Sequence, residues 1–505
     1  MKRNRSDSDS ESSDHYHPDD RQKVIPLGKT LGAEDQKIFD SLKTLNNQHH
    51  LWTAFTRKQQ QVFSEAFDSI SKETFDDLKA TYNTAGNQYR VDEEIAKANN
   101  AHVLTNYVPS GKHTDKLVVM FMNIGSGDCI FIQTPKGKTI VVDCGQRATP
   151  KLRPKYRTEI QDMLKGPLFL DGQNKSLYAL ILTHPDQDHY NEVTEIIKPS
   201  VTHVEHAFYT LSKADYSEKA TNPTSTNNET TKTYLNKARI LNKVTINSSG
   251  AALETSENNG WKTLYDVGFG KNKNENKIQI LGKHATRANW DEDNCSIYLL
   301  AAEVPPTHKD TKPNAASIVT LIEAYNRKIL LCGDATYSTE TFLLEEHPEI
   351  VKNIDLAQLE HHGSGTEHAS DEFVKKINPV LAAASSGPHK LDMNPRWVTI
   401  DKFVNPTTLG VNSNKRRICK EMDEHTIKYA TDNGWTDRNT NNWQKTYKKY
   451  GLFTTESNND LCFMIDKDGN LIREYSDATN TYTYKIDAGG KVTTTTTPLT
   501  KKSTS

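Results

Sequence analysis

The stretch Thr183-His-Pro-Asp-Gln-Asp-His189 decides the fold, and it follows directly on the apolar run Tyr178-Ala-Leu-Ile-Leu182. Such a run is typical of a buried strand, and this one ends abruptly in polar residues. Two histidines and two aspartates then occur within seven residues. Imidazole and carboxylate groups are the usual protein ligands of divalent ions in hydrolytic sites. The stretch therefore predicts a metal site at the end of a buried strand.

Side chains with the same chemistry follow three other β-rich runs. Asp143, Asp334 and the pair His361-His362 each come directly after such a run. Ligands in open α/β sheets gather at one set of strand ends, so we expect these groups to lie together. Asp334 is suited to bridge two ions, which at about 3.5–4 Å apart lower the pKa of a shared water. Aspartates after strands also begin turns, but turn chemistry alone does not explain four such clusters in order.

The chain alternates short β-rich runs with helical segments, which indicates α/β layering. Towards the N-terminus, apolar residues recur at three- and four-residue steps, which is typical of helices that could contact a protein partner. The two ends are too polar to bury a core, so we expect disorder there. The predicted organisation is an acidic serine-rich tail (1–28), a helical appendage (29–112), a site-bearing domain (113–478) with insertions at about 209–277 and 396–448, and a threonine-rich tail (479–505).

Composition excludes several classes of protein. Charges nearly cancel, with 63 Lys and Arg against 65 Asp and Glu, so bulk electrostatics does not demand nucleic acid. The six cysteines form no CxxC pair, which favours reduced thiols over a disulfide framework. No apolar stretch approaches the roughly 20 residues of a membrane span, and no signal peptide is visible. We predict a cytoplasmic protein without membrane association.

The ordered motifs resemble those of metallo-β-lactamase-fold hydrolases. More narrowly, they are similar to the hydrolase domain of the DNA-internalisation competence protein ComEC family. The likeness covers about residues 116–475 and rests on the segments 124–132, 135–145, 183–189, 314–319, 330–335 and 361–364. It implies a four-layer αββα sandwich with the metal site at one edge of the sheets. The expected fold is therefore α/β, with a helical N-terminal appendage and disordered termini.

The resemblance also implies a set of site residues. Of the pair His361-His362 it favours His362 as a ligand, because Gly-Ser follows, and it leaves His361 as an alternative ligand or a general acid. The predicted metal ligands are His184, Asp186, Asp188, His189, Asp334 and His362. The predicted catalytic residues are Asp188, His361 and His389, and those expected to orient ligands or substrate are Asp128, Asp143, Asn314, Ser317 and Ser364.

Two departures from the family pattern concern the metal. Asp186 stands where most enzymes of the fold have a histidine, and an oxygen ligand there suits manganese or magnesium as well as zinc. The strand that often supplies a further histidine contains His203 and His206, and neither stands at its end. We therefore expect one or two divalent ions, with zinc as the first candidate. The isolated residues His284 and His368 are more typical of capped or solvent-facing histidines than of ligands.

The predicted function is metal-dependent hydrolysis of a phosphodiester by a metal-activated hydroxide. Its substrate class includes nucleic acid, which makes the chain a candidate nuclease. A second hypothesis keeps the fold and places a thioester or other acyl compound in the site, where a metal would polarise a carbonyl. A third hypothesis is a degenerate scaffold without catalysis that binds a protein partner through residues 30–100.

Overall fold

The structure is a computed structural model. It describes residues 115–147, 153–170, 175–217, 230–247, 250–257, 260–263, 278–280, 295–306, 310–365, 367–387, 394–404, 425–430, 443–448, 451–476 and 480–498. The chain divides into two compact units, Met1–Ala101 with Asn433–Asn442, and His102–Asp432 with Trp443–Ser505. All described residues belong to the second unit. The predicted tail 1–28 and the helical appendage 29–112 lie outside them, so both remain predictions.

The first sheet contains 12 strands in the order β21-β20-β19-β18-β1-β2-β3-β4-β5-β6-β7-β8. Neighbours from β3 to β6 run parallel, so their carboxyl ends meet at one edge. The strands are β1 (Leu117–Phe121), β2 (Cys129–Gln133), β3 (Thr139–Cys144), β4 (Ser176–Ile181), β5 (His203–Tyr209), β6 (Ile240–Asn247), β7 (Gly250–Glu257), β8 (Gly260–Thr263), β18 (Leu461–Ile465), β19 (Leu471–Ser476), β20 (Asn480–Ile486) and β21 (Val492–Pro498).

The second sheet contains seven strands in the order β17-β14-β13-β12-β11-β10-β9. The neighbouring pairs β12–β13, β13–β14 and β14–β17 run parallel, so the carboxyl ends of these four strands also meet at one edge. The strands are β9 (Ile278–Ile280), β10 (Cys295–Ala301), β11 (Val319–Ala324), β12 (Arg327–Leu331), β13 (Leu356–Gln358), β14 (Leu381–Ala384) and β17 (Leu452–Thr454). A separate hairpin joins β15 (His425–Ala430) and β16 (Trp443–Lys448).

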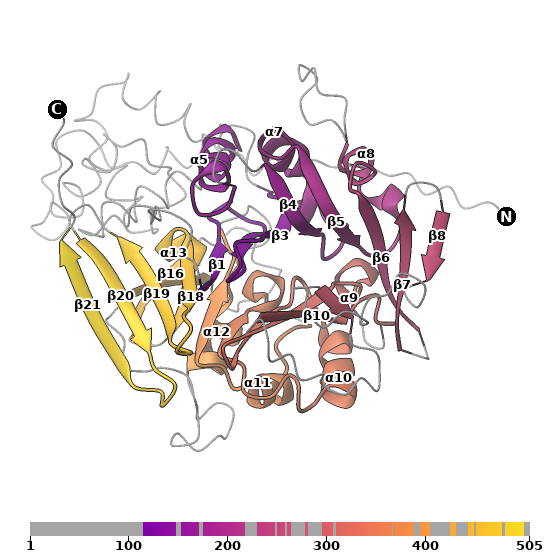
Figure 1. The fold of residues 1–505 in the computed structure, drawn as a ribbon. Coiled ribbons are helices and arrows are strands. Elements are labelled where there is room, and N and C mark those ends of the chain that lie inside the picture. Colours follow the sequence, from indigo (N-terminus) through magenta and orange to yellow (C-terminus); the bar gives the residue numbers. More distant parts are fainter. Residues whose placement is uncertain are drawn as a thin grey trace, which may run out of the picture. The chain divides into compact units, whose positions relative to one another are not determined.

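Helices cover the outer faces of the two sheets. Figure 1 shows α5 and α7 beside the first sheet, and α10, α11 and α12 beside the second. The helical segments are α5 (Arg153–Lys165), α6 (Gln187–Tyr190), η4 (Val193–Ile197), α7 (Lys198–Ser200), η5 (Lys213–Asp215), α8 (Thr231–Leu235), α9 (Lys312–Ala315), α10 (Tyr337–Glu346), η7 (Glu360–Gly363), α11 (Asp371–Ile377), α12 (Trp397–Val404) and α13 (Thr455–Asn458). The predicted α/β layering is confirmed, with two sheets between two layers of helices.

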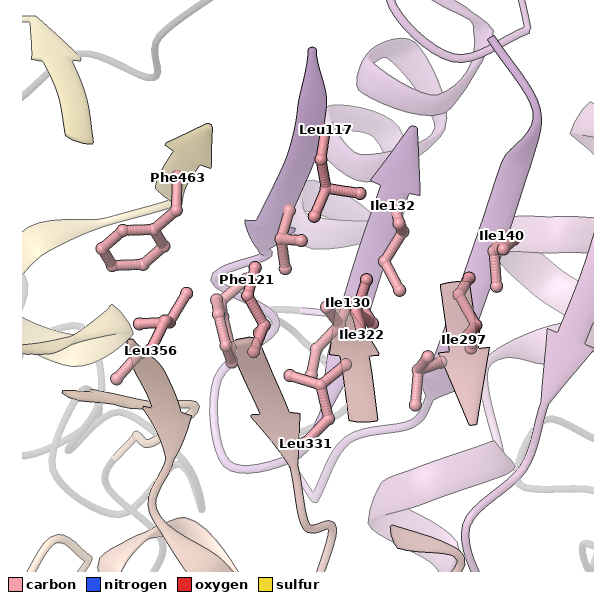
Figure 2. Packing of buried hydrophobic residues seen from close by; sticks show 14 of the residues in the cluster. Leu117, Phe121, Ile130, Ile132, Ile140, Ile297, Ile322, Leu331, Leu356 and Phe463 are labelled. Carbon is pink, nitrogen blue, oxygen red and sulfur yellow. The ribbon is translucent and has the colours of Figure 1, made fainter. Parts of the chain in front are cut away.

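The main hydrophobic core lies between the sheets. Alternate residues of a strand point to the same face, and Ile130 and Ile132 of β2 are both buried in one cluster with Ile322 and Leu331 of the second sheet. Figure 2 shows these side chains pointing toward one another. Each fully buried side chain of this size contributes about 1.5–3 kcal/mol. The core fixes the two sheets against each other and so fixes the loops at their edges.

A second cluster lies between the second sheet and its helices. Leu330 of β12 packs there with Leu343 of α10, Phe373 of α11 and Ile400 of α12.

Both predicted insertions contain regular structure where the chain is described. Residues 209–277 supply β6 to β8, and residues 396–448 supply α12 and the β15–β16 hairpin. Among the described helices, none combines the length and the apolar character that a membrane crossing requires.

The prediction of a disordered tail beginning at residue 479 is wrong for most of that segment. Residues 480–486 and 492–498 form β20 and β21, which pair antiparallel and extend the first sheet from β19. Tyr484 and Ile486 are buried in the core between the sheets. The threonine-rich composition suggested a solvated tail, but threonine is β-branched and favours an exposed edge strand.

A buried carboxyl group makes stability depend on pH. Asp460 precedes β18, and its Oδ1 accepts a hydrogen bond from the backbone N of Asn123 (2.6 Å). Burial raises the pKa of Asp460 from 3.8 to about 7. The folded state therefore holds this proton more tightly than the unfolded state. Its ionisation costs stability progressively as the pH rises from about 4 to about 7, and the whole cost is present above pH 7.

We expect Asp460→Asn to raise the melting temperature at pH 8 by a few degrees and to change it little at pH 4. The amide oxygen of asparagine still accepts from Asn123 and carries no charge. Thermal unfolding of the two proteins across this pH range checks the expectation, with the exposed Asp468→Asn as the control. A variant less stable than the wild type at pH 8 would contradict it.

Candidate metal centre

The predicted metal motif lies on the edge where the parallel strands of the first sheet end. Residues 183–189 follow β4 and enter the short helix α6. The loop after β3 passes directly beneath that helix. At Gly145 a Cβ atom would lie 2.4 Å from the backbone N of both His189 and Tyr190. The motif is therefore fixed by backbone packing that only glycine permits.

Gly145→Ala should displace α6 and destabilise the fold by about 1–3 kcal/mol or more, because the colliding atoms belong to rigid backbone. The metal affinity of the variant should fall as well, since His189 moves with its backbone. Denaturant unfolding and metal titration measure the two effects. The matched control is Gly489→Ala in the turn before β21, where the nearest atom to a new Cβ is a side-chain oxygen at 3.3 Å. Equal stability of the two variants would refute the packing argument.

The structure brings the predicted ligands of both sheets into one buried cluster. Residues 183–189 come from the first sheet, Asp334 follows β12, and His361 and His362 lie in η7 after β13. Asp188 and His189 are 2% and 0% exposed, and Asp334 is 1% exposed. The ligand atoms of His184, His189 and Asp334 lie within 4.8 Å of one another, as do those of Asp188, His189 and His362.

Asp334 lies at the centre, and each of its carboxylate oxygens faces two imidazole rings. Oδ1 lies 3.1 Å from Nε2 of His189 and 3.7 Å from Nε2 of His362. Oδ2 lies 3.4 Å from Nε2 of His361 and 3.7 Å from Nε2 of His184. We name these two groups the Oδ1 side and the Oδ2 side. A carboxylate placed in this way could be shared by ions held on its two sides.

Two further carboxylates join the two sides. Asp188 belongs to the Oδ1 side, because its Oδ2 lies 3.4 Å from Nε2 of His362. Asp186 belongs to the Oδ2 side, because its Oδ2 lies 3.7 Å from Nε2 of His184. The side chain of Asp186 is 32% exposed, whereas that of Asp188 is 3% exposed. The Oδ2 side therefore opens to solvent through Asp186, and the Oδ1 side is the more enclosed.

The polar atoms of this cluster fit a cation. Five buried atoms of the cluster make no hydrogen bond of good geometry among the described residues, although two of them, Nε2 of His189 and Oδ1 of Asp334, lie 3.1 Å apart: Nε2 of His184, His189 and His362, and Oδ1 of Asp188 and Asp334. Buried polar atoms without partners are rare, since each costs about 1–3 kcal/mol. Coordination of divalent ions would satisfy all five. The residues present therefore fit the metal that the sequence predicts.

Hydrogen bonds to the far side of each ring hold the imidazoles in place. Nδ1 of His189 lies 2.8 Å from Oδ2 of Asp143, and Nδ1 of His362 lies 2.9 Å from the carbonyl of Ser385. Nδ1 of His184 lies 3.1 Å from the Thr183 hydroxyl. An acceptor at Nδ1 places the ring proton there and leaves the Nε2 lone pair facing the cluster. Second partners of this kind are typical of metal-binding histidines.

The charged groups of the cluster shift one another's pKa values. Burial raises the pKa of Asp334, but the neighbouring imidazoles of His189 and His361 outweigh burial and hold it well below its usual range. Burial lowers the pKa of His362, but the carboxylates of Asp334 and Asp188 raise it to about 9. Metal ligation requires a neutral imidazole, so a divalent ion that binds here displaces protons from the rings.

The residues predicted to orient the ligands differ in what they contact. Asp143 accepts hydrogen bonds from the backbone N (2.7 Å) and hydroxyl (2.6 Å) of Thr183 as well as facing His189. Ser317 accepts from the backbone N of Asp334 (3.2 Å), and its hydroxyl lies 3.3 Å from Nδ1 of His184. Asp128 lies 3.7 Å from Nδ1 of His189. All three contact residues of the cluster, and their role in orienting metal ligands stays a prediction.

Other predicted residues lie apart from this network or outside the described residues. Ser364 is buried, and its carbonyl accepts a hydrogen bond from the Thr399 hydroxyl. Oδ1 of Asn314 is buried without a hydrogen-bond partner in the part of the chain that the structure describes. His389 lies outside the described residues, so its catalytic role stays a prediction.

Four residues that contact the cluster were not predicted from the sequence. Gln358 donates to Oδ2 of Asp128 (2.9 Å) and accepts from the backbone N of Cys332, which ties the two sheets together beneath the site. Nε of Arg147 lies 3.1 Å from Oδ2 of Asp188. His368 lies behind His361, and the backbone carbonyl of Ser385 faces Nδ1 of His362. Gln358 ends the fully buried run of β13, which could have indicated that it is buried, whereas no local pattern marks the other three.

The segment that contains residues 183–189 matches a known protein family. Residues 122–218 match the sequence profile of the metallo-beta-lactamase superfamily. The match spans β2 to β5 and all of residues 183–189, and it ends before Asp334 and the two histidines of η7. A search of curated proteins finds no match to the chain.

Proposed function

We propose that this chain, which contains a metallo-beta-lactamase superfamily domain at residues 122–218, is a metal-dependent hydrolase that acts on phosphodiesters. The superfamily match and the buried cluster of histidines and aspartates support the hydrolase, and divalent ions such as zinc are the expected cofactors. The phosphodiester as substrate, with nucleic acid as one candidate, is our inference from the geometry of the site. The motifs similar to those of the ComEC hydrolase domain support the same substrate class.

The observation that carries the proposal is the position of Asp334 between four imidazole nitrogens, with two on each carboxylate oxygen. Residues on the two sides would hold two ions, with Asp334 between them. Two adjacent divalent ions lower the pKa of a coordinated water and stabilise both the attacking and the leaving oxygen of an in-line displacement at phosphorus. Paired sites of this kind also hydrolyse acyl compounds, so our preference for the phosphodiester rests on the cation beside the cluster and on the motif resemblance.

Residues around the cluster have matching roles toward such a substrate. Arg147 is one-third exposed at the side chain, and its Nε contacts Asp188 at the rim of the site. A guanidinium group suits a non-bridging phosphate oxygen better than a neutral carbonyl. Oδ1 of Asp188 is buried without a hydrogen-bond partner among the described residues, so this carboxylate would hold an ion on the Oδ1 side together with its bound water.

The test is a parallel assay of bis(p-nitrophenyl) phosphate and a p-nitrophenyl thioester with zinc, manganese and magnesium in turn. We expect hydrolysis of the phosphodiester and a fall in kcat/KM of at least about 100-fold in Asp188→Ala. The exposed Asp468→Ala is the control and should keep full activity. Faster hydrolysis of the thioester would favour the acyl hydrolase. A metal-loaded protein that hydrolyses neither substrate would refute the proposal.

Two simple experiments distinguish a non-catalytic scaffold and a nuclease from a general phosphodiesterase. A non-catalytic scaffold would purify without bound metal and would not take up metal on reconstitution. Single- and double-stranded DNA and RNA, each incubated with the active protein and with Asp188→Ala, would identify a nuclease. A protein partner for residues 30–100 and a cytoplasmic location remain predictions, and the predicted partner segment lies outside the described residues.

A further inference from the structure

The Oδ2 side lacks the histidine that a neighbouring strand was expected to supply. That strand is β5, in which His206 pairs with Ala179 in the middle of β4. The His206 ring packs against the rings of Tyr178 (5.4 Å between centroids) and Phe208 (6.1 Å). His203 lies at the start of β5 with its side chain 45% exposed, beside Glu205. His203 and His206 therefore stand at the start and in the middle of β5, and neither stands at the carboxyl end of the strand, where the cluster lies.

His361 occupies the position that this ligand would take. Its Nε2 lies 3.4 Å from Oδ2 of Asp334, the same oxygen that lies 3.7 Å from Nε2 of His184. The backbone directs it there, because His361 and His362 both have positive φ (47° and 58°). Consecutive left-handed residues turn the two rings to different oxygens of Asp334. Such strained conformations in residues other than glycine persist mainly at functional sites.

His368 fixes the protonation of His361. Nδ1 of His368 lies 2.6 Å from the carbonyl oxygen of Ala335, which can only accept, so this nitrogen carries a proton. A neutral His368 that carries its proton on Nδ1 accepts at Nε2, the nitrogen that faces His361. Nδ1 of His361 lies 2.6 Å from that Nε2 and therefore donates to it. The remaining nitrogen of His361, Nε2, then presents a lone pair to Asp334 and the Oδ2 side.

This order of protons argues against His361 as a general acid. A general acid must carry its proton on the nitrogen that faces the substrate, and here that nitrogen is the unprotonated one. His368 thus links His361 to the carbonyl of Ala335, the residue next to Asp334. The segment that carries Asp334 therefore also holds the His361 ring in place.

We propose that His361 is a metal ligand on the Oδ2 side, in the place of a strand histidine, and that His368 is the positioning residue that keeps its Nε2 lone pair on the ion. The ion would be one that accepts imidazole, such as zinc or cobalt. The inference rests on the proposed function only in assuming that the cluster binds metal. It assigns the Oδ2 side to His184, Asp186, His361 and Asp334, and the Oδ1 side to Asp188, His189, His362 and Asp334.

Titration of the metal-free full-length protein with cobalt(II), followed by its visible absorption and by calorimetry, tests the proposal. The wild type should bind two ions. His361→Ala should keep one tight ion and bind the other at least about 100-fold more weakly, with loss of the absorption of that site. His368→Ala should weaken the same ion about 10- to 100-fold. His368→Gln should restore part of the affinity, because its amide can accept from His361 and donate to Ala335.

His203→Gln is the matched control, since it removes an exposed imidazole far from the cluster, and it should bind two ions as the wild type does. Circular dichroism shows whether the variants fold, and His361→Gln replaces His361→Ala if the latter does not. Two ions of unchanged affinity in His361→Ala or His361→Gln would overturn the proposal, as would a wild type that binds only one ion. A wild type that binds two ions and cleaves no phosphodiester would refute the proposed function and leave this assignment intact.

Discussion

The variant Asp334→Asn should bind divalent ions about 100- to 3,000-fold more weakly than the wild type and should lose hydrolysis to the background rate. Its carboxylate faces four imidazole nitrogens at 3.1–3.7 Å, and the side chain is almost fully buried. Removing one partner from a buried charge pair costs about 3–5 kcal/mol, and each 1.4 kcal/mol is about tenfold in a binding constant. An amide of the same shape keeps the packing and removes the charge between the two ions.

Calorimetric titration with zinc and the phosphodiester assay measure the two losses in the same preparation. The control is Asp468→Asn, which removes a carboxylate from an exposed turn and should leave both quantities unchanged. If Asp334→Asn binds two ions with wild-type affinity, Asp334 does not bridge them. The cluster would then need a different explanation for its unpaired buried atoms.

The variant Asp143→Asn should bind metal about 10- to 100-fold more weakly while keeping the fold. Asp143 never needs to touch the ion, because its Oδ2 holds the Nδ1 proton of His189 at 2.8 Å. Asparagine can keep the hydrogen bond from the backbone N of Thr183 and tolerates the positive φ of 56° at this position. Its amide hydrogens would face Nδ1 of His189. That ring would then carry its proton on Nε2 and could not ligate.

Metal titration and thermal unfolding of Asp143→Asn separate this effect from a loss of structure. The matched control is Asp355→Asn, another buried aspartate, which pairs with Arg327 at 2.8 Å and lies away from the cluster. We expect the control to lose stability and to keep metal affinity, and Asp143→Asn to show the reverse pattern. A pattern in which both variants lose stability and neither loses metal affinity would contradict the role of Asp143.

Most of the metal cluster could be predicted because its ligands stand next to strong local signals. Residues 183–189, Asp143 and Asp334 each follow an apolar strand, and parallel strands bring such ends to one edge. The alternation of strands and helices indicated α/β layering, and the resemblance to metallo-β-lactamase-fold hydrolases implied two sheets. The threonine-rich strands β20 and β21 were missed because their composition is also that of a solvated tail, and only pairing with β19 distinguishes the two.

The parts that were missed depend on contacts that no local pattern encodes. His368 contacts His361 from seven residues further along the chain, and the residue types do not indicate the two successive left-handed residues at 361 and 362. Ser385 orients His362 through its carbonyl, which every residue possesses, so its identity carries no signal. Tertiary geometry, rather than sequence spacing, therefore decides which histidine completes the Oδ2 side.

The central claim is that the cluster around Asp334 binds divalent metal. The most direct test is the metal content of the full-length protein after reconstitution with zinc and removal of free ions, measured by elemental analysis alongside Asp334→Asn. We expect two equivalents of zinc per wild-type chain and a much lower zinc content in Asp334→Asn. Wild-type protein that retains no metal, or a variant that retains as much as the wild type, would contradict it.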